Sequence, residues 1–200
     1  MWFTRREQNP PPAADPGMDA TPERPVSAWR ENIESLVWAV ALALLIRTFI
    51  MAPFRIPSGS MRPTLIEGDR ILVNKFLYHF RLPKRGDIIV FRYPEDPKRP
   101  FIKRLVGLGG EDVEIRDGHI FVNGDQLDGD GLFGHNEYFN QGTYGAAHEV
   151  IRVPEGSYFV LGDNSGSSHD SRFWGYVPRR LMIGRAMCIF WPFTRWRVLK

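Results

Sequence analysis

Two serines in one loop are the first residues whose types and setting fit covalent chemistry. Ser58 and Ser60 lie two residues apart in PSGSMRPTL, residues 57–65, directly after the most apolar part of the chain. Pro57 and Pro63 restrict the backbone of this loop. A loop stiffened in this way can hold one hydroxyl for attack on a carbonyl and another as a hydrogen-bond donor. Serines in loops rich in proline and glycine are also common turn formers, so both interpretations stay open.

Lys103 is a candidate general base. The strand-like segment FIKRLVG, residues 101–107, carries the adjacent cations Lys103 and Arg104 among apolar residues. Because side chains alternate across a strand, a half-buried strand would bring one of the two cations inward or to the rim of the core. Desolvation lowers the pKa of a buried lysine, whose neutral amine can then accept a proton, whereas arginine stays protonated. The strand pattern alone favours the alternative, in which both cations keep their charged ends in water.

Other chemistries have weaker support in the sequence. None of the five histidines forms a pair with metal-ligand spacing, and the single cysteine excludes a multi-cysteine zinc site, so we expect no metal. A triad of Ser60, His169 and Asp163 can be drawn, but a chain of this size always permits one such drawing. The 26 Lys and Arg residues are scattered and the net charge is only +3, so we expect no nucleic-acid partner.

The elements that must position these residues are short strands. Segments rich in Val, Ile and Phe, bounded by Gly, Pro and Asp, cover residues 70–76, 87–93, 101–108, 112–124, 148–154, 157–163 and 185–191. The pair Asp117–Gly118 predicts a hairpin turn. We predict a mainly β fold, with an antiparallel β domain over residues 55–200 and a small inserted β lobe at 112–154.

The start of the chain has a different character. Residues 1–31 are predicted to form a disordered tail, because the first part is rich in proline and lacks apolar periodicity. Residues 35–54 are apolar apart from Arg47, and as a helix they would extend about 30 Å, enough to span a bilayer. Arg47 lies off centre, so its guanidinium could reach the interface. We predict one transmembrane anchor over residues 32–54, with a buried or interfacial helix as the alternative; flanking charges do not decide its orientation.

Five segments occur in a fixed order along the chain. They are PSGSMRPTL (57–65), GDRILVNKF (68–76), RGDIIVFRYP (85–94), FIKRLVGLGGE (101–111) and GDNSGSSHDSRFWGYVP (162–178). Together they resemble the characteristic segments of bacterial type I signal peptidase, or leader peptidase, from the anchor to about residue 192. The resemblance implies a membrane-bound serine–lysine endopeptidase that removes signal peptides from exported preproteins and needs no metal or organic cofactor.

The resemblance also implies roles for individual residues. Ser60 would be the nucleophile and Lys103 the general base. Ser58 would supply a side-chain donor to the oxyanion hole, together with the backbone N–H of Ser60. This assignment agrees with the chemistry inferred above from the loop and from the strand.

The last segment carries the implied supporting residues and one departure from the family pattern. Ser168 would hydrogen-bond and orient the lysine, with Asp170 and Arg172 in support. The family's segment usually reads G-D-N-R-D-N-S-x-D-S-R, whereas residues 165–167 here are Ser, Gly and Ser. The chain therefore lacks a charged pair, which puts the rigidity of the loop in doubt but not the class of reaction.

An extended substrate that pairs with a strand edge directs alternate side chains into the enzyme. Shallow apolar pockets would then select the small-x-small pattern at which signal peptides are cut. The resemblance makes five residues candidates to line these pockets, with core positions as an equal alternative: Phe54, Ile56, Met61, Leu65 and Ile102.

The implied partners are preprotein signal peptides and the lipid bilayer. We expect a monomer in the cytoplasmic (inner) membrane, with a single span, a cytoplasmic tail and the catalytic domain on the outer, extracytoplasmic face. Two alternatives stay open. One is a related serine–lysine maturation peptidase for pilus or conjugation proteins. The other is a membrane-anchored β domain that binds peptides without cutting them, although the presence of both Ser60 and Lys103 weighs against it.

Overall fold

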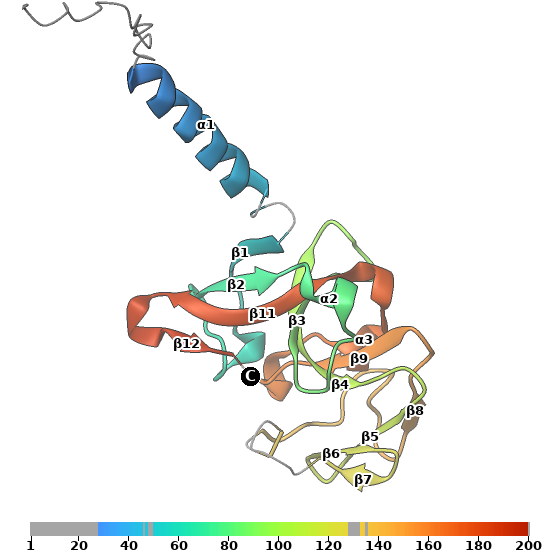
Figure 1. The fold of residues 1–200 in the computed structure, drawn as a ribbon. Coiled ribbons are helices and arrows are strands. Elements are labelled where there is room, and N and C mark those ends of the chain that lie inside the picture. The colour runs from blue at the N-terminus through green and yellow to red at the C-terminus, as the bar shows by residue number, and fades with distance from the viewer. Residues whose placement is uncertain (1–27, 46, 48–49, 128–132, 135, 200) are drawn as a thin grey trace, which may run out of the picture. The chain divides into compact units, whose positions relative to one another are not determined.

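The computed structural model describes residues 28–45, 47, 50–127, 133–134 and 136–199. The chain divides into two compact units, Met1–Val40 and Ala41–Lys200. Most of the predicted tail, residues 1–31, lies outside the described part. Figure 1 shows the helices and strands in chain order, from blue at the N-terminus to red at the C-terminus.

The helix α1, Ala28–Leu45, covers only part of the predicted anchor. Its early turns contain Arg30, Glu31 and Glu34, so its uncharged part begins at Ser35. Among the described residues, the structure contains no helix that is both long enough and apolar enough to cross a membrane.

The strand β1, Met51–Arg55, corrects the predicted extent of the anchor. It pairs antiparallel with β2, Arg70–Asn74, from Met51 opposite Asn74 to Arg55 opposite Arg70. An apolar run fits a buried strand as well as a membrane helix, so composition alone could not separate the two. Pro53 disfavours a helix but is tolerated in an edge strand, and β1 is the outermost strand of its sheet.

The large sheet has eight strands, in the order β1-β2-β11-β3-β4-β9-β10, with β12 paired to β11. Its remaining strands are β3 (Ile88–Arg92), β4 (Pro100–Gly107), β9 (Ser157–Leu161), β10 (Val177–Pro178), β11 (Met182–Trp191) and β12 (Arg197–Val198). Its strand pairs are antiparallel, which confirms the predicted mainly β fold. The short helices α2, Leu77–Phe80, and α3, Ser171–Trp174, connect strands of this sheet.

Residues 112–154, called the lobe below, carry a second sheet of four strands in the order β7-β6-β5-β8. These strands are β5 (Asp112–Arg116), β6 (His119–Val122), β7 (Asp125–Gln126) and β8 (Val150–Arg152). The predicted turn between β5 and β6 is confirmed: Asp117 and Gly118 have φ angles of 51° and 78°, as a type I′ turn requires.

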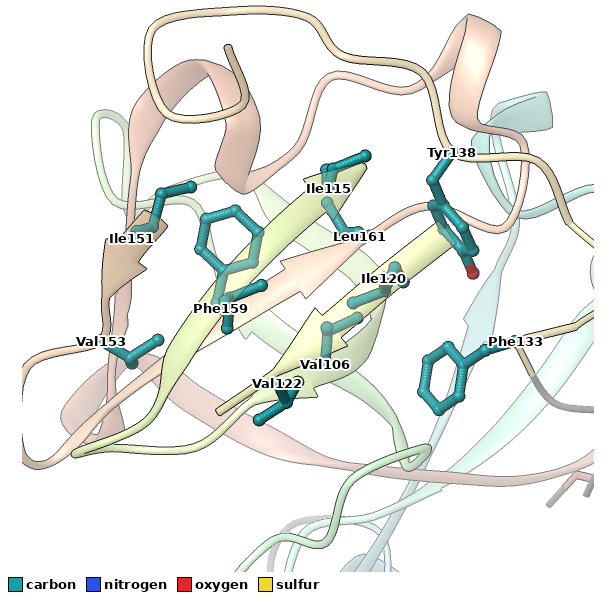
Figure 2. Close-up of a cluster of buried hydrophobic side chains, with 11 residues drawn as sticks. Val106, Ile115, Ile120, Val122, Phe133, Tyr138, Ile151, Val153, Phe159 and Leu161 are labelled. Carbon is teal, nitrogen blue, oxygen red and sulfur yellow. The ribbon is translucent and has the colours of Figure 1, made fainter. Parts of the chain in front are cut away.

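A common core joins the lobe to the large sheet. Ile115, Ile120 and Tyr138 of the lobe belong to the same buried cluster as Phe159 and Leu161 of β9 (Figure 2). Apolar side chains buried in this way contribute about 1.5–3 kcal/mol each. The lobe is therefore held against the strand that leads into the segment at residues 162–172.

Candidate active site

Lys103 Nζ and Ser60 Oγ lie 2.7 Å apart in a hydrogen bond. Lys103 lies in β4, opposite Ile89 of β3, and Ser60 lies in a short 3-10 helix, Gly59–Met61. Both residues are buried, with exposed fractions of 4% for Lys103 and 7% for Ser60. A hydroxyl within hydrogen-bond reach of a buried amine is the arrangement that an activated serine nucleophile requires.

The loop that carries Ser60 is fixed from both sides. Met61 and Leu65 are fully buried in the core beneath it, and Leu65 N donates to Met61 O at 2.8 Å. From the opposite segment, Asn164 N donates to Ser60 O at 3.1 Å, and Asn164 Nδ2 donates to Gly59 O at 3.1 Å. The hydroxyl of Ser60 is therefore carried on a backbone with little freedom to move.

Burial lowers the pKa of Lys103 from its ordinary value to about 8, because the ammonium form is poorly solvated there. The charges of Asp170 and Asp163 act in the opposite direction, and Arg172 adds to the lowering. A lysine with this pKa is neutral in part of the molecules near pH 7 and can accept a proton from a neighbouring hydroxyl.

Arg104 is buried as well, with 3% of its surface exposed. Its guanidinium binds Asp163 through two parallel bonds of 2.7 Å, from Nε to Oδ1 and from Nη2 to Oδ2, and Nη1 donates to Gly86 O at 2.9 Å. The strand pattern favoured two cations with their charged ends in water, yet both lie inside. The Arg104–Asp163 pair was not predicted, and the adjacent Lys and Arg in an apolar strand were the available signal.

The histidine triad is not formed. Asp163 is engaged by Arg104, and His169 Nε2 lies 3.2 Å from the Tyr93 hydroxyl. The hydrogen bond that the structure gives the Ser60 hydroxyl comes from Lys103. Within the described residues, no group of three or more His, Cys, Asp and Glu side chains could hold a metal ion.

Asp170 and Arg172 form a second buried pair, and both are fully buried. Arg172 donates to Asp170 from Nε and from Nη2, each at 2.8 Å, and Gly162 N donates to Asp170 Oδ2 at 3.0 Å. Ser168 is buried beside this pair, but its Oγ has no hydrogen-bond partner among the described residues. The predicted bond between Ser168 and Lys103 is therefore absent here, and Lys103 Nζ donates to Ser60 instead.

Ser165 anchors the segment that lacks the family's charged pair. Its Oγ accepts from Arg172 Nη1 at 2.7 Å and from Phe139 N at 2.9 Å, and Arg172 Nη1 also donates to Phe139 O at 2.8 Å. These bonds hold the segment to the lobe. This role of Ser165 was not predicted, because no local pattern connects a serine to a backbone amide 26 residues away.

Ser58 precedes the 3-10 helix in an extended conformation, with φ of −139° and ψ of 159°. Its side chain makes no capping bond to the helix, and the residue is exposed.

An apolar groove of about 80 Å³ lies where the chain enters the loop at residues 57–65, which is called the nucleophile loop below because Ser60 is its predicted nucleophile. It is lined by Phe54, Arg55, Ile56, Pro57, Ile71, Val90, Pro100, Phe101 and Ile102. Three of the predicted pocket residues, Phe54, Ile56 and Ile102, are among them. Met61 and Leu65 are not: both are fully buried in the core that packs against these residues.

Comparison with known proteins identifies the family of this chain. The family model described as "Signal peptidase, peptidase S26" matches residues 29–191. The chain is 42% identical to signal peptidase I of Leptolyngbya laminosa, over 96% of this chain and 95% of that protein. It is 41% identical to a probable signal peptidase I-2 of Synechocystis, over 86% and 77% of the two chains. It is 37% identical to signal peptidase I of Pseudomonas fluorescens, over 76% and 69%. The chain belongs to the signal peptidase family, peptidase S26.

Proposed function

We propose that this protein is a serine endopeptidase that cleaves signal peptides from exported preproteins, with Ser60 as nucleophile and Lys103 as general base. The observation that carries the proposal is the 2.7 Å contact between two buried residues. Family membership and the names of the relatives support the class of substrate.

The first step is acylation of the serine. Neutral Lys103 accepts the proton of the Ser60 hydroxyl, and Ser60 Oγ attacks the scissile carbonyl. The Ser58 hydroxyl and the backbone N–H of Ser60 donate to the oxyanion that develops. The ammonium of Lys103 then protonates the amine of the mature protein as the peptide bond breaks.

The second step is hydrolysis of the acyl-enzyme. Lys103, neutral again, accepts a proton from a water molecule that attacks the ester. The buried pairs Asp170–Arg172 and Arg104–Asp163 hold the segments around the base. The charges of Asp170 and Asp163 raise the pKa of Lys103, and the charge of Arg172 lowers it. The reaction needs no metal or organic cofactor.

The apolar groove accounts for selection of small residues. Its volume of about 80 Å³ is small, and Phe54, Ile56 and Ile102 form its walls. A substrate strand laid along it would direct small side chains inward near the cut. The residues on the signal-peptide side of the bond therefore occupy this groove.

We further propose that the chain acts at the cytoplasmic membrane, anchored through its N-terminal segment, with the catalytic domain on the outer face. The support lies in α1, where large apolar side chains are exposed, including Leu36 at 62%, Trp38 at 69% and Leu42 at 58%. Exposed apolar surface of this kind is typical of a membrane or protein contact.

The test uses the full chain in detergent with a preprotein whose signal peptide ends in a small-x-small site. Wild type is expected to release a product whose new N-terminus, read by mass spectrometry, lies directly after that site. Ser60→Ala and Lys103→Ala should abolish the cut, while Lys98→Ala, a matched change of an exposed lysine, should not. Cleavage by Ser60→Ala would overturn the proposal, and binding without cleavage by wild type would favour the peptide-binding alternative. Preference for a pilin-like precursor over the preprotein would favour the maturation peptidase.

A further inference from the structure

A second cavity lies where the chain leaves the nucleophile loop. It has a volume of about 440 Å³ and is lined by Arg62 and Pro63, by residues 163–166 and by Asn136, Glu137 and Phe139 of the lobe. The apolar groove lies at the other end of the same loop, against residues 54–57. In the sequence, Ser60 therefore lies between residues 54–57, which line the groove, and Arg62 and Pro63, which line the cavity.

The cavity is connected to the nucleophile by direct bonds. Asn164, which lines it, donates to the backbone carbonyls of Ser60 and Gly59, each at 3.1 Å. An extended substrate whose signal-peptide side occupies the apolar groove must continue past Ser60 in the other direction. The residues that follow the scissile bond would then reach the space beside Arg62 and Pro63.

The wall that the lobe contributes is fixed. Tyr138 is buried in the lobe's core (Figure 2), and its backbone N donates to Gly118 O at 2.9 Å. Glu137 and Phe139, on either side of it, are exposed. Phe139 is held by Ser165 Oγ at 2.9 Å and by Arg172 at 2.8 Å. A wall held this firmly presents side chains to a substrate at little cost in conformational entropy.

Three charged side chains line the cavity, Arg62, Glu137 and Asp163, and two of them are paired. Arg62 pairs with Glu67 at 2.7 Å, and the buried Asp163 pairs with Arg104. Glu137 makes no ion pair with any residue that the structure describes. The cavity thus presents a net negative charge to a bound chain, which favours basic side chains over acidic ones.

We propose that this cavity binds the first residues of the mature protein, on the leaving side of the scissile bond, and that Glu137 makes it prefer basic or neutral residues to acidic ones. The proposal rests on the proposed function, and it gives the lobe a part in substrate recognition. It concerns specificity alone, so the chemistry at Ser60 and Lys103 is unchanged.

The experiment compares peptides that share the signal side and the cut and differ only at the first two mature positions, which carry Lys, Gln or Glu. For wild type at low salt, kcat/KM is expected to be about threefold to tenfold higher for the Lys peptide than for the Glu peptide. This ratio is the size expected when Glu137 makes exposed charge contacts with the two mature residues. Glu137→Gln should remove this preference and Glu137→Lys should reverse it. Raising the salt concentration screens these charges, so the Lys-to-Glu ratios of kcat/KM for wild type and both Glu137 variants should become similar.

Two further variants sharpen the result. Glu155→Lys makes the same charge change at an exposed residue that follows the lobe directly and lies outside the cavity lining, and it should keep the wild-type ratio. Gly166 lines the cavity, and a Cβ there would meet only the Phe139 ring, at 3.6 Å. Gly166→Leu should therefore lower kcat/KM for peptides with bulky mature residues more than for peptides with Ala there.

The outcomes separate the two proposals. If wild type cuts none of the peptides, the proposed function fails. If wild type cuts them but Glu137→Lys shows the same Lys-to-Glu ratio as wild type, or Glu155→Lys shifts it equally, the cavity does not bind the mature side and the inference is overturned.

Discussion

Lys103 and Arg104 are consecutive in β4 and both are buried, but their side chains lie on opposite faces of the strand. Lys103 reaches Ser60 and has a pKa lowered to about 8, whereas Arg104 binds Asp163 through two bonds of 2.7 Å. One buried cation is thus fully paired, and the other meets a neutral hydroxyl. This difference allows the lysine to lose its proton while the arginine stabilises the fold.

The pH dependence of cleavage should report the titration of Lys103. Because burial lowers the pKa of Lys103 to about 8 and the neutral amine is the active form, kcat/KM should rise about tenfold per pH unit below that value and level off above it. The measurement is a pH–rate profile with a peptide that does not titrate in this range. A profile that is flat from pH 6 to 9 would contradict the assigned base.

Removal of the buried amine should stabilise the protein at neutral pH while it abolishes activity. The pKa of Lys103 is about 8 in the folded state and about 10.4 when unfolded, so the unfolded chain binds more protons between these values and wild-type stability rises there with pH. Lys103→Met should therefore raise the free energy of unfolding at pH 7 by up to about 3 kcal/mol. Urea denaturation at pH 7 and pH 10 checks this, and the gain should shrink at pH 10. The exposed Lys98→Met is the control, and an equal gain in that variant would refute the explanation.

Loss of the Arg104–Asp163 pair should destabilise the fold strongly. Both side chains are almost fully buried, so Asp163→Asn leaves a buried guanidinium without its counter-charge, at a cost of about 3–5 kcal/mol. The matched control is Asp112→Asn, which breaks the exposed Arg152–Asp112 pair and should cost at most about 1 kcal/mol. Denaturation midpoints of the two variants give the comparison, and similar losses in both would show that burial of the pair does not matter.

Ser58 should act on the transition state more than on binding. If its hydroxyl donates to the oxyanion, Ser58→Ala should lower kcat about 10²- to 10³-fold with little change in KM. Ser58→Thr keeps a hydroxyl and should recover part of the activity. Ser167→Ala, at an exposed serine of the opposite segment, should have no effect on kcat. A drop in Ser58→Ala that appears only in KM would indicate a role in substrate binding instead.

Much of the site could be predicted because its residues lie in ordered segments with strong local patterns. Val- and Ile-rich runs bounded by Gly and Pro predicted the strands of the large sheet, and the Asp117–Gly118 turn was confirmed by its positive φ angles. Ser60 and Lys103 were named as a pair from their segments, and the structure brings them into contact. Local pattern alone did not suffice there, because the strand pattern favoured a solvent-exposed Lys103, and the two residues were joined by the resemblance of their segments to a known family.

Other features depended on contacts between distant segments. The apolar run at residues 51–55 became the strand β1 because β2 supplied its backbone partners, whereas composition predicted a membrane helix. Met61 and Leu65 packed into the core instead of the groove, and the Ser168 hydroxyl did not meet Lys103.

The sequence by itself determined the class of fold, because strand periodicity is a local property of the chain, and its ordered segments carried the resemblance from which Ser60 and Lys103 were predicted as nucleophile and base. Only the tertiary structure decided that Lys103 and Arg104 are both buried, that Ser165 holds Phe139 of the lobe, and that Glu137 is among the residues that line a cavity beside the nucleophile loop. Burial and hydrogen bonding depend on which surfaces meet when the sheets pack, and residues separated by tens of positions carry no local sign of that meeting.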